Sequence, residues 1–311
     1  MAKILVTPRS LTSGGDPALA LLKEHGHELV FSPSGVQPTE RQLLELLPGC
    51  VGYLAGVETI SARVIDAAGD LKVISRNGTG VDAIDLAACA RRGIRVLRAE
   101  GANARGVAEL TIGLLLDLAR RISLSDAVVE SGGWKRYKGF EVEGKVLGIV
   151  GCGKVGKLVA QLAIGMGMRV VGFDPYPDRD FHPGPSFRFA LLEELFRESH
   201  AVTLHCPPLP EGRPLIDAGA IGMMRPGALL INAARAELVD EQTVLDALDA
   251  GRLGGFATDV HRVEPPGKSE LIAREGVLAT PHIGGYTGQS VERATRVAVD
   301  NLLAALAEAG A

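Results

Sequence analysis

The sequence predicts an α/β protein with two doubly wound parallel sheets, and three observations support this. Short runs rich in Val, Ile and Leu alternate with helical patterns of ten or more residues, as in parallel sheets with helices on both faces. These runs form two series that are separated by one long helical pattern. The length of 311 residues, 46% of them hydrophobic, is enough for about two domains with cores of their own.

The first series fills the first hundred residues. Its predicted helices, each bounded by Gly, Pro or Asp, lie at residues 17–25, 39–47, 62–68 and 86–92. The strands between them are expected at residues 4–7, 28–31, 51–54, 73–75 and 95–97. A long helix is then predicted over residues 103–130, and Ser-Gly-Gly ends it before Trp134.

The second series begins at Lys145 and belongs to the larger sheet. At least six strands are expected, at residues 146–150, 169–173, 201–206, 228–232, 255–260 and 277–280. A last helix, residues 287–307, follows the final strand and is placed to return to the first series. We therefore expect a discontinuous substrate domain, residues 1–100 and 286–311, with a nucleotide domain of residues 101–285 inserted into it.

Composition and charge exclude several classes of protein. The formal net charge is -4 and no segment concentrates Lys and Arg, so we expect no nucleic-acid partner. The most apolar window, residues 110–119, is too short for a membrane span, and the N-terminal apolar run is too short for a secretory signal. The four cysteines lie far apart without metal-ligand spacing, so we expect neither disulfides nor a metal site. We therefore expect a cytoplasmic protein.

A glycine-rich turn follows the first strand of the second series. Gly151, Gly153 and Gly156 have the spacing of a dinucleotide-binding turn, with a strand before them and a helical stretch after them. In such a turn Gly151 permits the tight bend, Gly153 lets the backbone approach a pyrophosphate, and Gly156 allows close packing of helix on strand. The helix N-terminus then stabilises the pyrophosphate through its free N–H groups and dipole.

The next strand indicates which dinucleotide binds. It ends at Asp174, 18 residues after Gly156, where a carboxylate can accept hydrogen bonds from the adenosine ribose diol. An acid at this place repels a 2′-phosphate. We therefore predict a Rossmann nucleotide domain that binds NAD in preference to NADP.

Three ionisable residues follow later strands of the same predicted sheet: Arg235, Glu264 and His282. Because the carboxyl ends of parallel strands share one edge, these side chains can meet there. Oxidation of a 2-hydroxy acid needs a base for the hydroxyl proton, and an imidazole titrates near working pH. Glu264 can fix the tautomer of His282, and Arg235 can hold the substrate carboxylate and polarise the 2-oxygen. The other histidines lack this combination.

At these residues the chain resembles the D-2-hydroxyacid dehydrogenase family, and within it the phosphoglycerate dehydrogenase branch. The resemblance covers nearly the whole chain. It is carried by RNGTGVD at residues 76–82, VAELTIGLL at 107–115, GKVLGIVGCG at 144–153, NAARAELVD at 232–240, DVHRVEPP at 259–266 and PHIGG at 281–285.

The resemblance implies a Rossmann domain inserted into a flavodoxin-like substrate domain, closure of the two domains on their ligands, and a homodimer paired through the nucleotide domain near Trp134. Arg235, Glu264 and His282 would be the catalytic trio. Arg76 and the backbone around Asn77 and Gly78 would bind substrate. Beside the glycine-rich turn, the NAD site would be lined by Thr79, Lys154, Val155, Asp174, Cys206, Ala233, Ala234, Asp259 and Gly285.

Departures from the family pattern leave the substrate open. Ala236 stands where the family commonly has Gly, and His261 replaces a frequent aromatic residue. Residues 55–59 lack the basic residue that phosphoglycerate-using members tend to carry, and Glu58 has the wrong charge, although Arg76 or residues 135–138 of a second subunit could serve a phosphate. The chain ends at Ala311, so we expect no further C-terminal regulatory domain. The alternatives are a glyoxylate or hydroxypyruvate reductase and an NAD-sensing protein like the corepressors of this fold.

Overall fold

The computed structural model describes residues 2–310, apart from the side chain of residue 211. Its internal contacts divide the chain into two compact units. Unit 1 runs to Asn103 and resumes at Gly288, and unit 2 is Ala104–Thr287. Each unit has one sheet, and every strand pair within either sheet is parallel.

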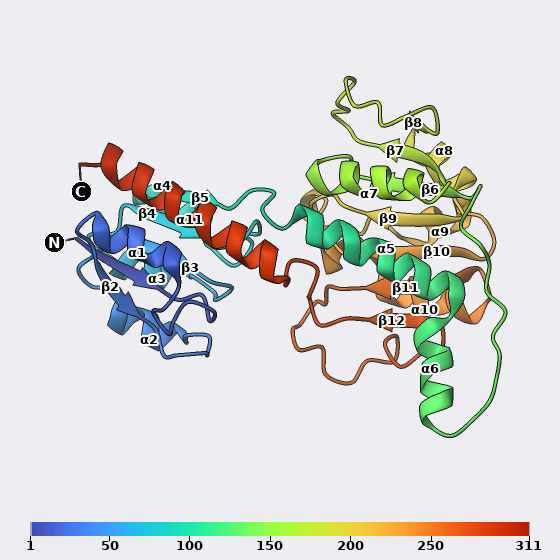
Figure 1. The fold of residues 1–311 in the computed structure, drawn as a ribbon, viewed down its shortest axis with the longest axis horizontal. Helices are drawn as coiled ribbons and strands as arrows, with labels where there is room; N and C mark the ends of the chain where they lie inside the picture. The colour runs from blue at the N-terminus through green and yellow to red at the C-terminus, as the bar shows by residue number, and fades with distance from the viewer. Residues whose placement is uncertain (1, 311) are drawn as a thin grey trace. The chain divides into compact units, whose positions relative to one another are not determined.

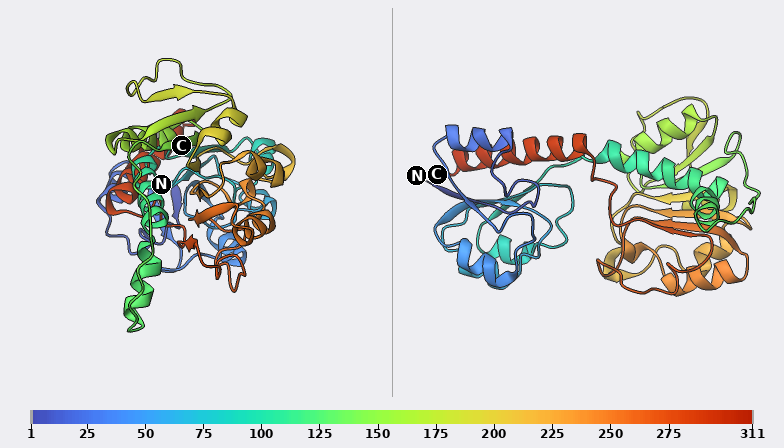
Figure 2. Two further views of the ribbon diagram at one scale, coloured as in Figure 1. Left: turned by 90° about the vertical axis from the view of Figure 1, so that its right-hand side faces the viewer. Right: turned by 60° about the horizontal axis from the view of Figure 1, so that its bottom comes forward.

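Unit 1 has a five-stranded sheet in the order β2-β1-β3-β4-β5, the order of flavodoxin-like folds. The strands are β1 (Lys3–Val6), β2 (Glu28–Phe31), β3 (Cys50–Ala55), β4 (Val73–Arg76) and β5 (Arg95–Arg98). One face packs on α1 (Pro17–Glu24) and α11 (Gly288–Glu308), and the other on α2 (Glu40–Leu46), α3 (Ala62–Ala67) and α4 (Leu86–Arg91) (Figure 2). The last helix of the chain therefore completes the core of the first unit.

The short helices of unit 1 begin at polar residues that cap them. The side chains of Asp16, Thr39, Ser61 and Asp85 each accept a hydrogen bond from a backbone N–H of the first turn. Thr39 also forms a capping box with Gln42. These caps fix where each helix starts, and hence where each strand–helix loop ends.

Unit 2 has a seven-stranded sheet in the order β12-β11-β10-β9-β6-β7-β8. The strands are β6 (Val146–Val150), β7 (Arg169–Phe173), β8 (Phe187–Phe189), β9 (Ala201–Leu204), β10 (Ala228–Asn232), β11 (Leu253–Thr258) and β12 (Val277–Ala279). The chain turns to one side of β6 for β7 and β8, and to the other side for the remaining strands. The point between β6 and β9 is therefore the topological switch point, where ligands bind in such sheets.

Helices cover both faces of this sheet. One face packs on α5 (Ala104–Arg120) and α7 (Lys154–Gly165), and the other on α8 (Leu192–Glu198), α9 (Ala218–Met223) and α10 (Glu241–Asp249). Short 3-10 helices occupy Pro210–Gly212 and Ala236–Leu238. Five buried strands form the middle of the sheet, and the three-residue strand β8 was not expected from the sequence. Phe187 and Phe189 of β8 stack edge to face instead of forming a long apolar run.

The long helix predicted over residues 103–130 is wrong in one respect, because it breaks at Arg121. Arg121 has a left-handed backbone (φ 55°), and its guanidinium donates to the carbonyl of Gly254 at 2.9 Å. Asp117 accepts the backbone N–H of Ser123, the second residue after the break, at 3.1 Å. The predicted helix is therefore two helices. The second, α6 (Ile122–Glu130), projects from the sheet (Figure 1), and none of its residues is buried.

The predicted fold class is confirmed: both sheets are parallel and doubly wound, and unit 2 is inserted into unit 1. Among the described helices, none combines the length and apolar character that a membrane span requires.

Candidate active site

The glycine-rich turn joins β6 to α7, beside the switch point of the unit 2 sheet. Gly151 has φ 92°, and a Cβ there would lie 2.6 Å from the backbone of His205. A Cβ on Gly156 would lie 2.1 Å from the Gly151 carbonyl oxygen, so α7 can approach the turn this closely only with glycine. A Cβ on Gly153, by contrast, would meet nothing within 4 Å. The space beside Gly153 is therefore open to a ligand.

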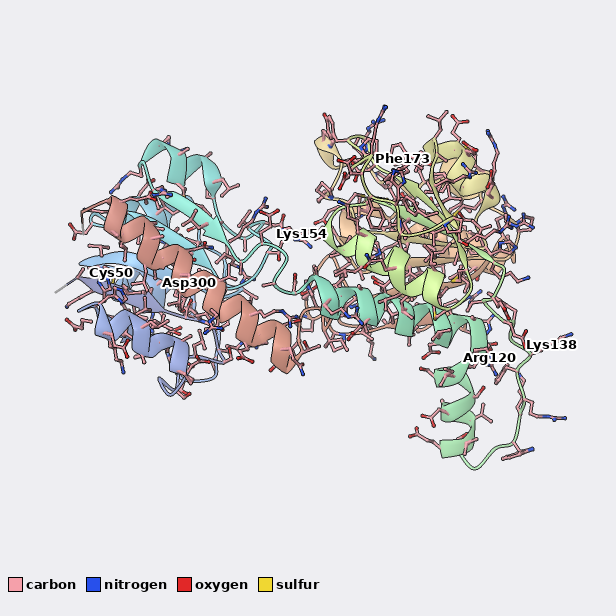
Figure 3. The ribbon with its side chains drawn as sticks, turned by 45° about the horizontal axis from the view of Figure 1, so that its top comes forward. Cys50, Arg120, Lys138, Lys154, Phe173 and Asp300 are labelled. Carbon is pink, nitrogen blue, oxygen red and sulfur yellow. The ribbon has the colours of Figure 1, made fainter. Side chains whose placement is uncertain are left out.

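The N-terminus of α7 is suited to the pyrophosphate of a dinucleotide. Gly153 is its N-cap and supplies no capping side chain. Within residues 2–310, the N–H groups of Gly153 and Val155 have no hydrogen-bond acceptor. Lys154, at the first position of the helix, adds a positive charge there (Figure 3). Free N–H groups at a helix start bind phosphate oxygens well.

Asp174 follows β7, whose last residue, Phe173, is labelled in Figure 3. The Asp174 carboxylate accepts the backbone N–H of Cys152 at 2.9 Å and that of Tyr176 at 2.9 Å. These bonds fix the carboxylate against the glycine-rich turn and leave further lone pairs on its oxygens. The residues present therefore fit NAD, with its pyrophosphate at α7 and its adenosine ribose at Asp174.

Two of the three predicted catalytic side chains meet at the carboxyl edge of the same sheet. Glu264 follows β11, and His282 follows β12. His282 Nδ1 lies 2.9 Å from Oε1 and 3.0 Å from Oε2 of Glu264. Nδ1–H is thus the donor to Glu264, which leaves Nε2 as the free position. Within the described residues Nε2 has no hydrogen-bond partner, and both side chains are about half exposed.

Asp259 holds the turn that carries His282. The backbone of His282 is left-handed (φ 54°), which is costly for a residue with a side chain. Asp259 is 2% exposed and accepts the N–H groups of Ile283 at 2.8 Å and Gly284 at 2.7 Å, together with the hydroxyl of Thr280. The sequence interpretation placed Asp259 among the NAD contacts. These bonds also make it the residue that positions His282, a role indicated only by its place directly after a buried strand.

His261 connects the two catalytic loops. Its backbone N–H donates to Glu264 Oε1 at 3.2 Å, and its ring Nε2 lies 3.0 Å from the Thr280 carbonyl oxygen. That carbonyl also accepts the backbone N–H of His282. Sequence reasoning assigned no role to His261, and the structure places it against both members of the Glu264–His282 pair.

Arg235 lies after β10, at the same edge. Its backbone is extended, its guanidinium donates to the Ala234 carbonyl at 2.7 Å, and its own carbonyl accepts the Asn232 side chain at 2.8 Å. Asn232 also accepts the N–H of Ala234 at 3.1 Å, so residues 232–235 form a fixed turn that includes two predicted NAD-lining residues, Ala233 and Ala234. β10, β11 and β12 are neighbours, so the three catalytic candidates follow three adjacent strands.

Two thiols and an imidazole near the switch point are held in their neutral forms. Burial, and then the charge of Asp174, raise the pKa of Cys152 to about 12, and burial raises the pKa of Cys206 to about 11. Burial lowers the pKa of His205 to about 3, and its Nε2 lies 2.9 Å from the Thr203 hydroxyl. Cys206 can therefore line a cofactor site but is not a nucleophile there. No group of acidic, His and Cys side chains within residues 2–310 is arranged to hold a metal ion.

Of the predicted substrate-binding residues in unit 1, Arg76 ends β4, and Asn77 and Gly78 follow it at the carboxyl edge of the sheet. The N–H of Asn77 donates to Ala55 and that of Gly78 to Arg76, so both are engaged. The next two N–H groups, of Thr79 and Gly80, have no acceptor within residues 2–310. The Thr79 hydroxyl donates to Asn103 at 3.0 Å. The free donors of this motif are therefore those of the two residues that follow the pair named from the sequence.

Glu58 lies inside unit 1, not on its surface. It is 2% exposed, and its Oε1 accepts the Tyr53 hydroxyl at 2.7 Å, the Gly56 N–H at 2.9 Å and the Thr7 hydroxyl. Burial, and then the Glu58 carboxylate, raise the pKa of Tyr53 well above its ordinary value, so this hydroxyl remains a donor. The sequence interpretation, in which Glu58 presents the wrong charge to a substrate phosphate, is corrected: the exposed residues of the loop are Val57 and Thr59.

A family model for the NAD binding domain of D-isomer specific 2-hydroxyacid dehydrogenases matches residues 112–284. The chain belongs to this family. These residues lie within unit 2, so unit 2 contains the NAD-binding domain of a D-2-hydroxyacid dehydrogenase. The resemblance inferred from the motifs, and NAD as the cofactor, are confirmed.

Relatives agree with this membership. The D-3-phosphoglycerate dehydrogenase of Methanocaldococcus jannaschii is 35% identical over 97% of this chain and 57% of its own length. The enzyme of that name from Homo sapiens is 35% identical over 85% of this chain and 51% of its own length. The chain thus spans about half the length of the curated relatives it matches.

Solved structures cover nearly the whole of this chain. A crystal structure of a protein from Thermus thermophilus has a TM-score of 0.87 and 38% identity, over 98% of this chain and 97% of that one. A D-lactate dehydrogenase from Treponema pallidum has a TM-score of 0.81 and 27% identity over the same shares. The fold of both units is therefore that of D-2-hydroxyacid dehydrogenases.

Proposed function

We propose that the protein is an NAD-dependent oxidoreductase that transfers a hydride between nicotinamide and C2 of a small D-2-hydroxy acid or its 2-oxo acid. The observation that carries this proposal is the Glu264–His282 pair, which lies at the carboxyl edge of the sheet that also carries the glycine-rich turn. When bound, NAD supplies the hydride acceptor, and NADH the hydride donor.

The residues of this chain would transfer the proton of the substrate hydroxyl and stabilise the charge that develops on the substrate. In the oxidative direction, Nε2 of His282 takes the proton from the 2-hydroxyl, because it is the ring nitrogen left free. Glu264 accepts Nδ1–H and stabilises the imidazolium that forms. Arg235 polarises the 2-oxygen, where negative charge develops when the 2-oxo acid is reduced. Asp259 keeps His282 in place throughout.

Unit 1 would serve as the substrate domain and unit 2 as the nucleotide domain. The free N–H groups of Thr79 and Gly80 are suited to the substrate carboxylate, since two adjacent backbone donors can bind its two oxygens. Arg76, at the end of β4, adds a positive charge at this edge. The unused N–H groups of Thr79 and Gly80 are therefore the physical reason why the RNGTG motif would bind substrate.

We also propose a cytoplasmic homodimer. The projecting helix α6 buries no residue, and Ile122, Val129 and Trp134 of this helix and the following segment are 54%, 57% and 87% exposed. Arg120 and Lys138, which bound this region, are labelled in Figure 3. Apolar side chains on a projecting element suit pairing with a second copy. All four cysteines are free thiols, as is usual for a reducing compartment.

For the substrate, a phosphoglycerate dehydrogenase-like activity is supported by the names of the curated relatives. A glyoxylate or hydroxypyruvate reductase is the second candidate, favoured by the exposed loop residues Val57 and Thr59, which carry no charge. The two differ in whether the substrate bears a phosphate.

The deciding experiment follows NADH absorbance with a panel of 2-oxo acids: phosphohydroxypyruvate, hydroxypyruvate, glyoxylate and pyruvate. We expect turnover of at least one, and the ranking selects the branch. If none is reduced while NADH binds normally, the enzyme proposal fails and an NAD-sensing binding protein becomes the better interpretation.

A further inference from the structure

One loop at the carboxyl edge of the unit 1 sheet lacks the positively charged side chain that a substrate phosphate would require. The loop of residues 55–59, between β3 and α3, has no Lys or Arg. Its one acidic residue, Glu58, is buried, and three donors satisfy it. The loop therefore presents only neutral side chains, Val57 and Thr59, to solvent. Within unit 1, a cation that serves this loop comes from a neighbouring strand end.

The neighbouring strand end is that of β1, which pairs with β3. Thr7, the residue after β1, shares hydrogen bonds with Gly56 and Glu58, so the two loops are joined. A Cβ on Gly56 would lie 3.2 Å from the Cα of Pro8, so the loops are also in van der Waals contact. Arg9 is the next residue of the chain. Its backbone therefore lies one residue beyond the contact between Pro8 and the uncharged loop.

The backbone of Arg9 is fixed, whereas its guanidinium is free. Leu11 N–H donates to the Pro8 carbonyl at 2.7 Å, and the Thr12 hydroxyl donates to the Arg9 carbonyl at 3.0 Å. Gly35 N–H donates to that same hydroxyl at 2.9 Å, which anchors the turn to the loop after β2. Arg9 is exposed, and in the part of the chain from residue 2 to residue 310 its guanidinium has no hydrogen bond or ion pair.

We propose that Arg9 is the specificity residue that recognises an anionic substituent, a phosphate, on C3 of the substrate. This rests on the proposed function. A guanidinium binds phosphate in a bidentate fashion, and a fixed backbone reduces what must be ordered on binding. Buried Glu58 contributes indirectly, because it ties the end of β1 to the loop and keeps its own carboxylate off the surface. Arg76 is less suited to this task, since its guanidinium already donates to the Asn77 carbonyl.

The test compares phosphohydroxypyruvate with hydroxypyruvate, in wild type, Arg9→Gln and Arg9→Lys. Removing hydrogen bonds to a charged group weakens binding strongly. We therefore expect Arg9→Gln to raise KM for phosphohydroxypyruvate about 10- to 100-fold. We expect kcat/KM for hydroxypyruvate to stay within about twofold, because that substrate has no phosphate. Arg9→Lys should recover part of the loss. Arg41→Gln, which removes an 86% exposed guanidinium from α2, is the matched control and should change neither substrate.

Inhibition by phosphate and calorimetric binding test the role of Arg9 in two further ways. Inorganic phosphate should inhibit hydroxypyruvate reduction competitively in wild type and more weakly in Arg9→Gln. Calorimetric titration with phosphohydroxypyruvate measures binding without turnover, so Arg9 is tested even if the chain proves inactive, which would sink the proposed function alone. Equal losses for both substrates, or no change in phosphohydroxypyruvate binding, would overturn the assignment. If Arg9→Gln does not fold, two measurements still test the role of Arg9. These are the kinetics of Arg9→Lys, and inhibition by phosphate in wild type compared with Arg41→Gln.

Discussion

Two buried carboxylates, one in each unit, each hold a loop in place by accepting hydrogen bonds. Asp259 in unit 2 and Glu58 in unit 1 are each 2% exposed, and each accepts three hydrogen bonds at the carboxyl edge of its sheet. Asp259 holds the turn of His282, the proposed base, whereas Glu58 holds the loop beside the proposed substrate-binding edge. The difference lies in how the bonds are shared. Asp259 uses both oxygens, and Glu58 receives all three bonds on Oε1.

This difference indicates how much each edge can change. The unit 2 turn depends on both oxygens of a charged group, because each accepts a backbone N–H that has no other acceptor within residues 2–310. The unit 1 loop depends on one acceptor atom, so a neutral residue of the same shape can hold it. We therefore expect the unit 2 turn to tolerate substitution less well than the unit 1 loop.

The largest effect is expected for His282→Ala. Loss of the general base should lower kcat by about 10²- to 10⁴-fold. NADH binding should remain near that of wild type, because the glycine-rich turn and Asp174 are unaffected. Steady-state kinetics and fluorescence titration of NADH measure the two quantities, and His25→Ala in unit 1 is a control for imidazole loss. A kcat within about twofold of wild type would contradict the assignment of His282 as the base.

The sequence predicts which groups lie at the unit 2 edge, but it does not predict the burial of Glu58 at the unit 1 edge, for a physical reason. The glycine-rich turn, Asp174, Glu264 and His282 follow clear strands, and strand ends of a parallel sheet share an edge. Glu58 has no such signal, because an acidic residue in a short loop is usually exposed, and its burial depends on Tyr53 and Thr7 from other parts of the sheet. The break at Arg121 was equally hidden, since its partner Gly254 is distant in sequence.

Asp259→Asn should have the second largest effect. In either orientation, the new amide group points its own N–H₂ at a backbone N–H of the 283–284 segment, which leaves that donor without an acceptor. We expect the unit 2 turn to lose about 3 kcal/mol of stability. Because His282 shifts with the turn, kcat should fall by about 10²-fold. Hydrogen exchange should rise in residues 280–285 and not in unit 1, and unchanged exchange at this turn would argue against the positioning role.

His205 predicts a pH dependence that arises in unit 2. Its pKa in the folded protein, about 3, is below that of the unfolded chain, so the folded state keeps the ring neutral. The unfolded state therefore binds the extra proton below about pH 6.5, and stability is lost as pH falls through this range. At pH 5 the loss should be about 2 kcal/mol relative to pH 7. His205→Gln should flatten this part of the urea-unfolding profile, and an unaltered slope would rule out His205 as its source.

Glu58→Gln should have the smallest effect and gives the sharpest test of the comparison. The glutamine oxygen can occupy the place of Oε1 and accept the bonds from Tyr53, Gly56 and Thr7, so only the charge is lost. Hydrogen bonds to a neutral acceptor are weaker, and we expect a cost of about 1 kcal/mol, confined to unit 1 in hydrogen exchange. Glu58→Ala, which leaves the buried donors without a partner, should cost more than twice as much. If Glu58→Gln proved as damaging as Asp259→Asn, the two carboxylates would be equivalent, and the charge of Glu58 would matter to the substrate edge as much as its shape.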